Sequence, residues 1–202
     1  MKAIALVAAA ALTSVAMADY TANWASGPDG WDNSQYQGTG ATGWTLTGGV
    51  WFAADLSGPS SEWLISPLLN VDAATVAFGF DHHYDMESTY DGGVVEYQVN
   101  GGAWTYLSMP DYDATISSNF QSPIGGLDAY TGGPFAKSSG QDISSLVTIG
   151  DSLMIRFHQA DDSSLSDVGW YIESFGIQGA SIPAPGVLAL MGLAGLVSRR
   201  RR

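Results

Sequence analysis

The stretch GVVEYQVNGGAWTYL, residues 93–107, contains the clearest indication of fold in this chain. Apolar and aromatic residues flank Asn100-Gly101-Gly102, and an Asn-Gly pair between two such segments favours a tight hairpin turn. We therefore predict a β-hairpin from Gly93 to Leu107. No long stretch of the chain has the apolar spacing of a helix, so the hairpin is expected to belong to an all-β protein.

Other segments have the same character of short strands between turns. In 74–84, the sequence ATVAFGFDHHY places Val76, Phe78 and Phe80 on one face of a strand. In 152–159, the sequence SLMIRFHQ does the same with Leu153, Ile155 and Phe157. Further strands are predicted in 43–53 around a Gly-Gly turn, in 62–69 and in 168–178.

Many short strands at this spacing predict one antiparallel β-sandwich of the jelly-roll type. We assign it to residues 19–181. The segment from Pro110 to Gly140 is rich in Gly, Ser and Asp. It is expected to form a long loop or a weak strand pair, and loops of that length often carry function.

The composition excludes several kinds of chemistry. The chain of 202 residues has no cysteine, which removes thiol catalysis, iron–sulfur clusters and thiolate zinc sites. All 20 acidic residues lie between Asp19 and Glu173, a range that contains only two basic residues, Lys137 and Arg156. Nucleic acid is not an expected partner, because binding phosphates requires Lys and Arg. The charge indicates solubility in salty water or, more specifically, a divalent-cation site.

The N-terminus predicts export. Lys2 precedes an apolar stretch from Ala3 to Val15, and Ala16-Met17-Ala18 has the small residues of a cleavage site. Residues 1–18 are therefore predicted to be a secretory signal peptide, removed after Ala18.

The C-terminus, residues 182–202, has three parts. A Pro183-Ala184-Pro185-Gly186 segment is followed by an apolar run from Val187 to Val197 and then by Arg199, Arg200, Arg201 and Arg202. We predict a short apolar helix that inserts transiently in the inner membrane, with the arginines on the cytoplasmic side. The layout resembles the PEP-CTERM sorting signal of Gram-negative bacteria, with Ala184 in place of the usual glutamate. The resemblance implies processing by an exosortase-type membrane protease and a final location at the cell surface or outside the cell.

A second resemblance covers roughly Glu62 to Ile177. The segments EWLISPLLNV, STYDGGVVEYQVNGGAWTYL and SLMIRFHQ followed by GWYIESFGI are similar to the MAM-like jelly-roll modules appended to immune inhibitor A metallopeptidases and many bacterial surface proteins. This resemblance implies a jelly roll in which the loops 81–93 and 161–167 lie close together. It also implies a cation site there.

Those two loops are the most acidic stretches of the chain, DHHYDMESTYDGG and DDSSLSD. Calcium takes six to eight oxygen ligands, and Glu87, Asp91, Asp161 and Glu173 could supply such a set, with calcium as a structural cofactor. The alternative is that these are solvated turn residues, since Asp and Gly favour turns. Zinc is not expected at His82-His83, because neighbouring residues of a strand point to opposite faces.

No hydrolase motif is present: there is no Gly-x-Ser-x-Gly and no His-Glu-x-x-His. We therefore expect a non-enzymatic, exported surface or matrix protein, with adhesion to surface proteins or binding of extracellular polysaccharide as its function. A structural exoprotein without a small ligand and a polysaccharide hydrolase are the alternatives. The aromatics Trp24, Trp31, Tyr112 and Tyr130 could stack on sugar rings or pack in the core. An exposed row of aromatics would favour carbohydrate binding.

Overall fold

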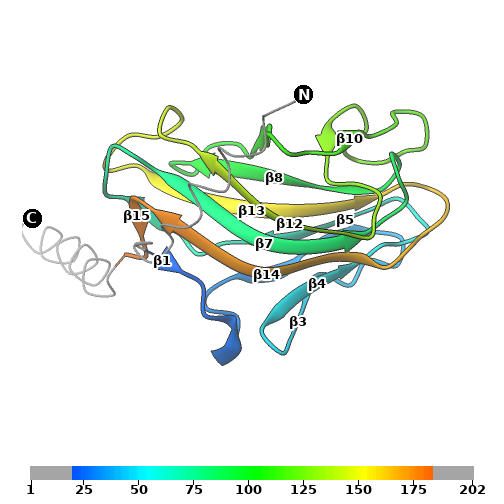
Figure 1. Ribbon diagram of the computed structural model, residues 1–202, viewed down its shortest axis with the longest axis horizontal. Helices are drawn as coiled ribbons and strands as arrows, with labels where there is room; N and C mark the ends of the chain where they lie inside the picture. The colour runs from blue at the N-terminus through cyan, green and yellow to red at the C-terminus, as the bar shows by residue number, and fades with distance from the viewer. Residues whose placement is uncertain (1–19, 184–202) are drawn as a thin grey trace, which may run out of the picture.

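The computed structural model describes residues 20–183, which form two antiparallel sheets packed face to face (Figure 1). The six-stranded sheet has the order β12-β7-β14-β4-β3, and β1 also pairs with β14. Its strands are β1 (Tyr20–Thr21), β3 (Thr45–Thr47), β4 (Val50–Ala54), β7 (Ala77–Asp85), β12 (Phe135–Asp142) and β14 (Gly169–Gln178).

The seven-stranded sheet is centred on β13, which pairs with β5 and β6 on one side and with β8 on the other. Strand β2 extends it beyond β5, β15 beyond β6 and β9 beyond β8. Its strands are β2 (Asp32–Gly38), β5 (Ser60–Ile65), β6 (Leu69–Val71), β8 (Gly92–Val99), β9 (Thr105–Leu107), β13 (Ser152–Asp161) and β15 (Ala180–Ser181). Outside the two sheets lie a short pair, β10 (Ala114–Thr115) with β11 (Asp128–Ala129), and one 3₁₀ turn, η2 (Trp24–Ser26).

The prediction of an all-β antiparallel sandwich of the jelly-roll class is confirmed. The hairpin of residues 93–107 is β8 with β9, and its turn has Asn100 and Gly101 at φ 54° and 67°, the left-handed values that the Asn-Gly pair favours. The apolar faces predicted for 74–84 and 152–159 are both buried between the sheets. Around them pack the largest buried side chains, among them Trp44, Trp51, Trp170 and Phe175.

Besides the short strands β1, β6 and β15, two longer strands were not predicted. Segment 110–140 contains the start of β12, a strand of eight residues at the edge of the six-stranded sheet, in addition to the weak pair β10–β11. Strand β2 is exposed along its whole length. Both strands are polar and are held by backbone pairing at a sheet edge, so neither shows the apolar alternation by which strands are recognised.

The two ends predicted as targeting segments lie almost wholly outside the described residues. This holds for the signal peptide with Ala16 and Ala18, and for the sorting signal from Ala184 onward. Within residues 20–183, the structure has no helix of the length and apolarity needed to cross a membrane.

Candidate functional site

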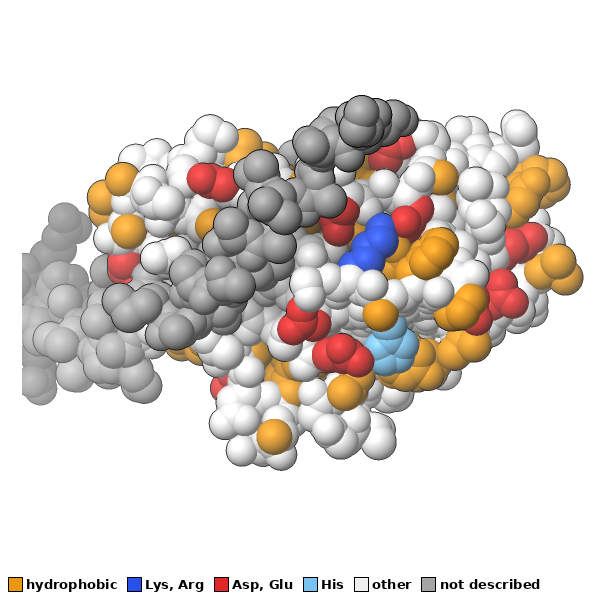
Figure 2. Space-filling model, viewed as in Figure 1, with side chains coloured by type: hydrophobic (Ala, Val, Ile, Leu, Met, Phe, Trp, Pro, Cys, Tyr) orange, Lys and Arg blue, Asp and Glu red, His pale blue; other side chains and the backbone are white. Residues whose placement is uncertain are grey.

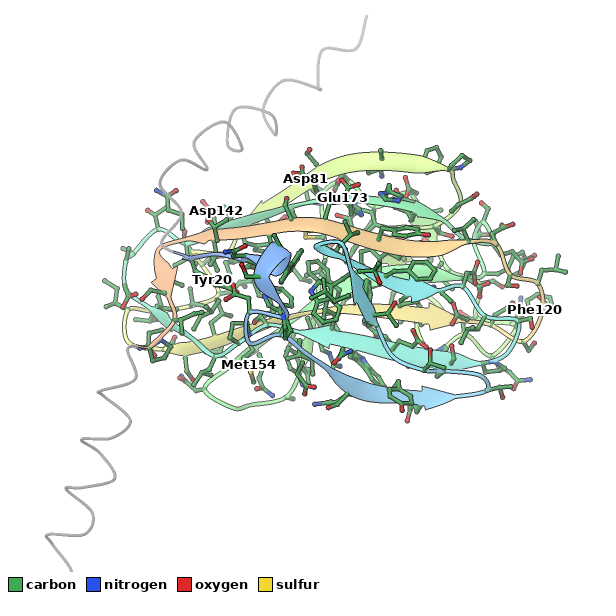
Figure 3. All side chains as sticks on the ribbon, turned by 90° about the horizontal axis from the view of Figure 1, so that it is seen from below. Tyr20, Asp81, Phe120, Asp142, Met154 and Glu173 are labelled. Atoms are coloured by element: carbon green, nitrogen blue, oxygen red, sulfur yellow. The ribbon has the colours of Figure 1, made fainter. Side chains whose placement is uncertain are left out.

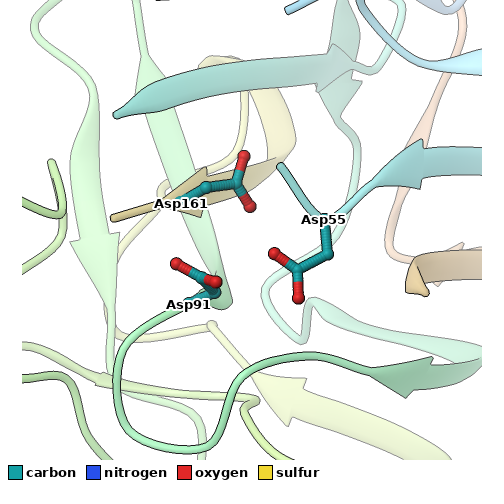
Figure 4. A group of neighbouring side chains, drawn as sticks. All are labelled: Asp55, Asp91 and Asp161. Carbon is teal, nitrogen blue, oxygen red and sulfur yellow. The ribbon is translucent and has the colours of Figure 1, made fainter. Parts of the chain in front are cut away.

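Carboxylates from both sheets meet at one end of the sandwich. Asp55 follows directly after β4, Asp91 precedes β8, and Asp161 is the last residue of β13. Each offers a carboxylate oxygen that lies within 4.8 Å of the others'. Figure 4 shows the three carboxylates turned toward one another. We call these three residues the aspartate cluster.

A second group adjoins the cluster and shares Asp91 with it. Glu87, Asp91 and Asp162 again place one carboxylate oxygen each within 4.8 Å. The stretches 81–93 and 161–167 are loops only in part, because 81–85 belong to β7, 92–93 to β8 and 161 to β13. The loop parts are in contact here, since the backbone N–H of Asp162 donates to Oδ1 of Asp91 at 2.5 Å. The two acidic loops therefore meet, as the family resemblance implied.

The aspartates are buried: Asp55 is 5% exposed, and Asp91, Asp161 and Asp162 are 0% exposed. Among residues 20–183, three of their oxygens find no hydrogen-bond partner, namely Oδ1 of Asp55, Oδ2 of Asp91 and Oδ2 of Asp162. A buried charge is costly unless it is paired or coordinates a metal. These unpartnered oxygens are the observation that distinguishes the site from ordinary acidic turns.

The remaining oxygens hold the loops in place. Oδ2 of Asp55 accepts the backbone N–H groups of Glu87 at 3.1 Å and of Asp167 at 2.9 Å. Oδ1 of Asp161 accepts from the side-chain amide of Gln159 at 2.8 Å, and its Oδ2 accepts from the hydroxyl of Ser60. The cluster is therefore built on fixed supports, and the carboxylates are oriented before any ion binds.

Burial is the main cause of the electrostatic strain in the cluster. It raises the pKa of Asp91 far above the ordinary range of an aspartate, and the neighbouring Asp55 raises it further. The pKa of Asp161 is also raised, first by burial and then by Asp55. The pKa of Glu87 is raised by burial and by Asp162.

The two basic residues of the described chain cannot relieve this strain. Nζ of Lys137 donates to Oδ1 of Asp113 at 2.6 Å and to the carbonyl of Asp111 at 2.7 Å. Within the seven-stranded sheet, Nε of Arg156 on β13 donates to Oε2 of Glu96 on β8 at 2.7 Å. A hard divalent cation is therefore the group whose charge and oxygen preference match the cluster.

The predicted ligand set is only partly brought together. Asp91 and Asp161 lie in the aspartate cluster, and Glu87 lies in the adjoining group. Glu173 is placed on the outer surface of the six-stranded sheet. Figure 3 shows it away from Phe120, whose carbonyl accepts the backbone N–H of Ser163, next to Asp162. On that outer surface, Oε1 of Glu173 accepts from Nδ1 of His83 at 2.9 Å.

The predicted set did not include Asp55 or Asp162, which the structure places in the two carboxylate groups. Asp162 stands in the acidic loop that was singled out, so its neighbour Asp161 pointed to it. Asp55 is isolated in the sequence, and its only signal is its position directly after a strand.

A second feature lies on the outer face of the six-stranded sheet. The strand registers pair Phe52 with Tyr171 and Tyr171 with His83, so three rings form one row across β4, β14 and β7. The ring centroids of Phe52 and Tyr171 are 4.4 Å apart, and those of Tyr171 and His83 are 4.2 Å apart. We call this set the aromatic row. His82 is buried on the opposite face, as the prediction for neighbouring strand residues required.

A groove of 440 Å³ begins where the row ends at His83. Figure 2 shows this face, with a histidine among hydrophobic side chains and acidic side chains beside it. The groove is lined by His83, Tyr84, Asp85, Pro134, Phe135, Ala136, Val168 and Tyr171. Its volume falls within the range of small-molecule sites. Of the four aromatics that could stack on sugar or pack in the core, Trp24, Trp31 and Tyr130 are buried in the core, and Tyr112 is mostly buried against it.

The groove and the aspartate cluster share two chain segments. Asp85 ends β7, two residues before Glu87, and Val168 follows Asp167 directly. The N–H of Val168 donates to the carbonyl of Asp85 at 2.9 Å. Since Asp55 holds both Glu87 and Asp167, it supports both of these groove walls.

No protein-family model and no curated protein sequence matches the chain. Among solved structures, a mutant form of the Emp46p carbohydrate recognition domain matches with a TM-score of 0.44 and 8% identity, over 78% of this chain and 92% of that chain. The potassium-bound form of the same domain gives 0.41 with the same identity and coverage. An exo-β-1,3-galactanase from Phanerochaete chrysosporium gives 0.28 with 14% identity, over 73% of this chain and 26% of that chain. Similarities this distant do not indicate a shared function.

Proposed function

We propose that this chain is an exported bacterial surface or matrix protein that binds extracellular carbohydrate in the groove beside the aromatic row. The observation that carries the proposal is the groove itself, in which one exposed ring, Phe135, and the partly exposed rings of His83 and Tyr171 adjoin free polar groups. Sugars present apolar C–H faces and hydroxyl edges, and sites that bind them combine ring surfaces with a few hydrogen-bonding groups.

Three features of the groove support this function. Phe135 and Val168 remain 46% and 48% exposed, which leaves apolar surface for a ligand. His83 presents the end of the aromatic row to the groove. The carboxylate of Asp85 has no hydrogen-bond partner among the described residues, so it is available to accept from sugar hydroxyls.

We propose binding rather than hydrolysis. Glycoside hydrolysis uses a pair of carboxyl groups that flank the scissile bond. Asp85 is the one carboxylic acid among the residues that line the groove. The proposed role is therefore adhesion to a polysaccharide or a glycosylated surface.

The termini support the location. A signal peptide that ends at Ala18 would export the chain, and a tail ending in Arg199, Arg200, Arg201 and Arg202 would hold it transiently at the inner membrane. An exosortase-type protease that acts near Pro183, Pro185 and Gly186 would then release it. The mature protein would begin at Asp19.

Filling the groove is expected to abolish sugar binding without unfolding the protein. Ala136 lies opposite His83 on the edge strand β12 and is exposed, so Ala136→Trp adds a large ring where the ligand would lie. We expect at least a tenfold loss of affinity for a bound oligosaccharide, roughly 1.4 kcal/mol, in a calorimetric titration of ligands found by glycan-array screening.

The matched control for this variant is Ser138→Trp, two residues along the same strand and on the same face but outside the groove. It should bind the oligosaccharide like the unmodified protein. If no glycan binds, or if Ala136→Trp binds as tightly as the control, the proposed function is wrong.

We further propose that the aspartate cluster binds calcium and that this ion orders the groove. A cation on Oδ1 of Asp55 would fix the carboxylate whose Oδ2 holds Glu87 and Asp167. Removing calcium with a chelator is therefore expected to weaken oligosaccharide binding by about tenfold, a typical coupling between linked sites. Saturating oligosaccharide should raise calcium affinity by the same factor. Equal oligosaccharide affinity with and without calcium would show that calcium binding and oligosaccharide binding are not coupled.

A further inference from the structure

The groove contains many hydrogen-bond acceptors and few donors. Asp85 contributes a carboxylate, which only accepts. Glu173 lies beside the groove and is 47% exposed at its side chain. Its Oε1 accepts from His83, and its second oxygen has no partner among the described residues.

His83 adds a further acceptor. Because an ionised carboxylate cannot donate, the 2.9 Å contact with Glu173 requires the proton of the ring to be on Nδ1. In the neutral imidazole, Nε2 then carries a lone pair and accepts. The one side-chain donor that lines the groove without a partner among the described residues is the hydroxyl of Tyr171.

No lysine or arginine is among the residues that line the groove. Lys137 follows Ala136 on β12, so its side chain points to the opposite face, where it contacts Asp111 and Asp113. Arg156 lies on β13, in the other sheet. An anionic sugar would therefore meet carboxylates and find no cation to pair with.

These groups are complementary to a ligand with many donors and a positive charge. An ammonium group has three N–H donors and no acceptor. Building on the carbohydrate binding proposed above, we infer that the groove selects amino sugars with a free, protonated amine, with Asp85 as the residue that pairs with the ammonium, and that it rejects uronic acids.

The experiment compares three oligosaccharides of equal length on the full chain, at equal calcium and at neutral pH. They are a glucosamine trimer, its N-acetylated counterpart and a uronic-acid trimer. We expect the glucosamine trimer to bind about tenfold more tightly than the N-acetylated one, as a charge-assisted hydrogen bond allows. The uronic-acid trimer should show no binding. The advantage of the free amine should shrink as salt is added.

Two variants separate the groove from the general acidity of the domain. Asp85→Asn should remove the preference for the free amine. Asp81→Asn causes the same loss of charge on the same sheet face, but Asp81 accepts from Ser138 at 2.5 Å and Ser174 at 2.8 Å and does not line the groove. This variant should keep the preference. Melting curves of both variants should match the unmodified protein.

The inference is overturned if both variants weaken amine binding equally, since the attraction would then be non-specific. It is also overturned if the uronic-acid trimer binds, or if the N-acetylated trimer binds as tightly as the free amine. In that last case Ala136→Trp still tests carbohydrate binding, which would stand without the amine preference. If none of the trimers and no other glycan binds, both proposals fail.

Discussion

Calcium is expected to raise the melting temperature of the metal-free protein by about 5 °C or more at a hundredfold excess over its Kd. A ligand that binds only the folded state adds about 2.7 kcal/mol of stability under that condition, and a domain of this size converts it to a shift of that order. The physical cause lies in Asp55, Asp91 and Asp161, whose buried carboxylates repel each other until a divalent ion neutralises them. Thermal melts with calcium and with a chelator measure the shift.

Asp91→Asn gives this prediction its sharpest form, because Asp91 belongs to both carboxylate groups. The substitution should abolish the calcium-specific shift. It should also raise the melting temperature of the metal-free protein at neutral pH. Burial and Asp55 raise the pKa of Asp91, so folding must keep a proton on this carboxyl that the unfolded chain releases, and a neutral amide removes that cost. A residue with a merely structural role would not make the metal-free protein more stable when it is replaced and also remove the stabilisation by calcium.

Magnesium at equal ionic strength is the control for general screening of charge, and it should stabilise less because it demands a tighter octahedron. Asp81→Asn controls for the loss of one negative charge elsewhere. Equal shifts in melting temperature with calcium and magnesium, or an unchanged calcium shift in Asp91→Asn, would show that the aspartate cluster is not a calcium site.

The metal-free protein should also lose stability as pH rises. Asp91 and Asp161 have raised pKa values in the folded protein, so the folded state retains protons that the unfolded chain releases above about pH 4. The free energy of unfolding therefore falls from about pH 4 upward through neutral pH. Calcium displaces these protons, so its stabilising effect should grow over the same range.

Gly93→Ala is expected to destabilise the protein by about 3 kcal/mol or more, at the upper end of overpacking effects. A Cβ at this position would lie 2.2 Å from Cζ3 and 2.3 Å from Cε3 of Trp170. Trp170 is fully buried and donates from Nε1 to Nδ1 of His82 at 2.9 Å. Gly93 cannot withdraw, because it exchanges two backbone hydrogen bonds of 2.9 Å with Tyr130. Urea unfolding measures the change.

The comparison variant is Gly101→Ala, in the β8–β9 turn. Its added Cβ would meet no atom within 4 Å, and only its φ of 67° disfavours the substitution. The expected loss is about 1–2 kcal/mol, the cost of a left-handed residue. If the two variants lose equal stability, the close packing of the sheets at Gly93 is not the cause.

The sequence by itself determined the all-β class, the hairpin of residues 93–107 and the buried faces of β7 and β13. These are local properties: side chains alternate at a period of two, and an Asn-Gly turn depends on its own two residues. The same alternation separated His82 from His83. The strands β2 and β12 escaped recognition because polar edge strands depend on a neighbour's backbone and carry no pattern of their own.

Only the tertiary structure decided the sites. Asp55 joins Asp91 and Asp161 because β4 and β13, from two different sheets, end at the same end of the sandwich at which β8 begins. Phe52, Tyr171 and His83 form one row because the hydrogen-bond registers of three strands align them. A register is set by pairing between segments far apart in the chain, and a slip of one residue would turn each ring to the other face. That is why the acidic loops could be singled out from the sequence, whereas the complete ligand set and the groove could not.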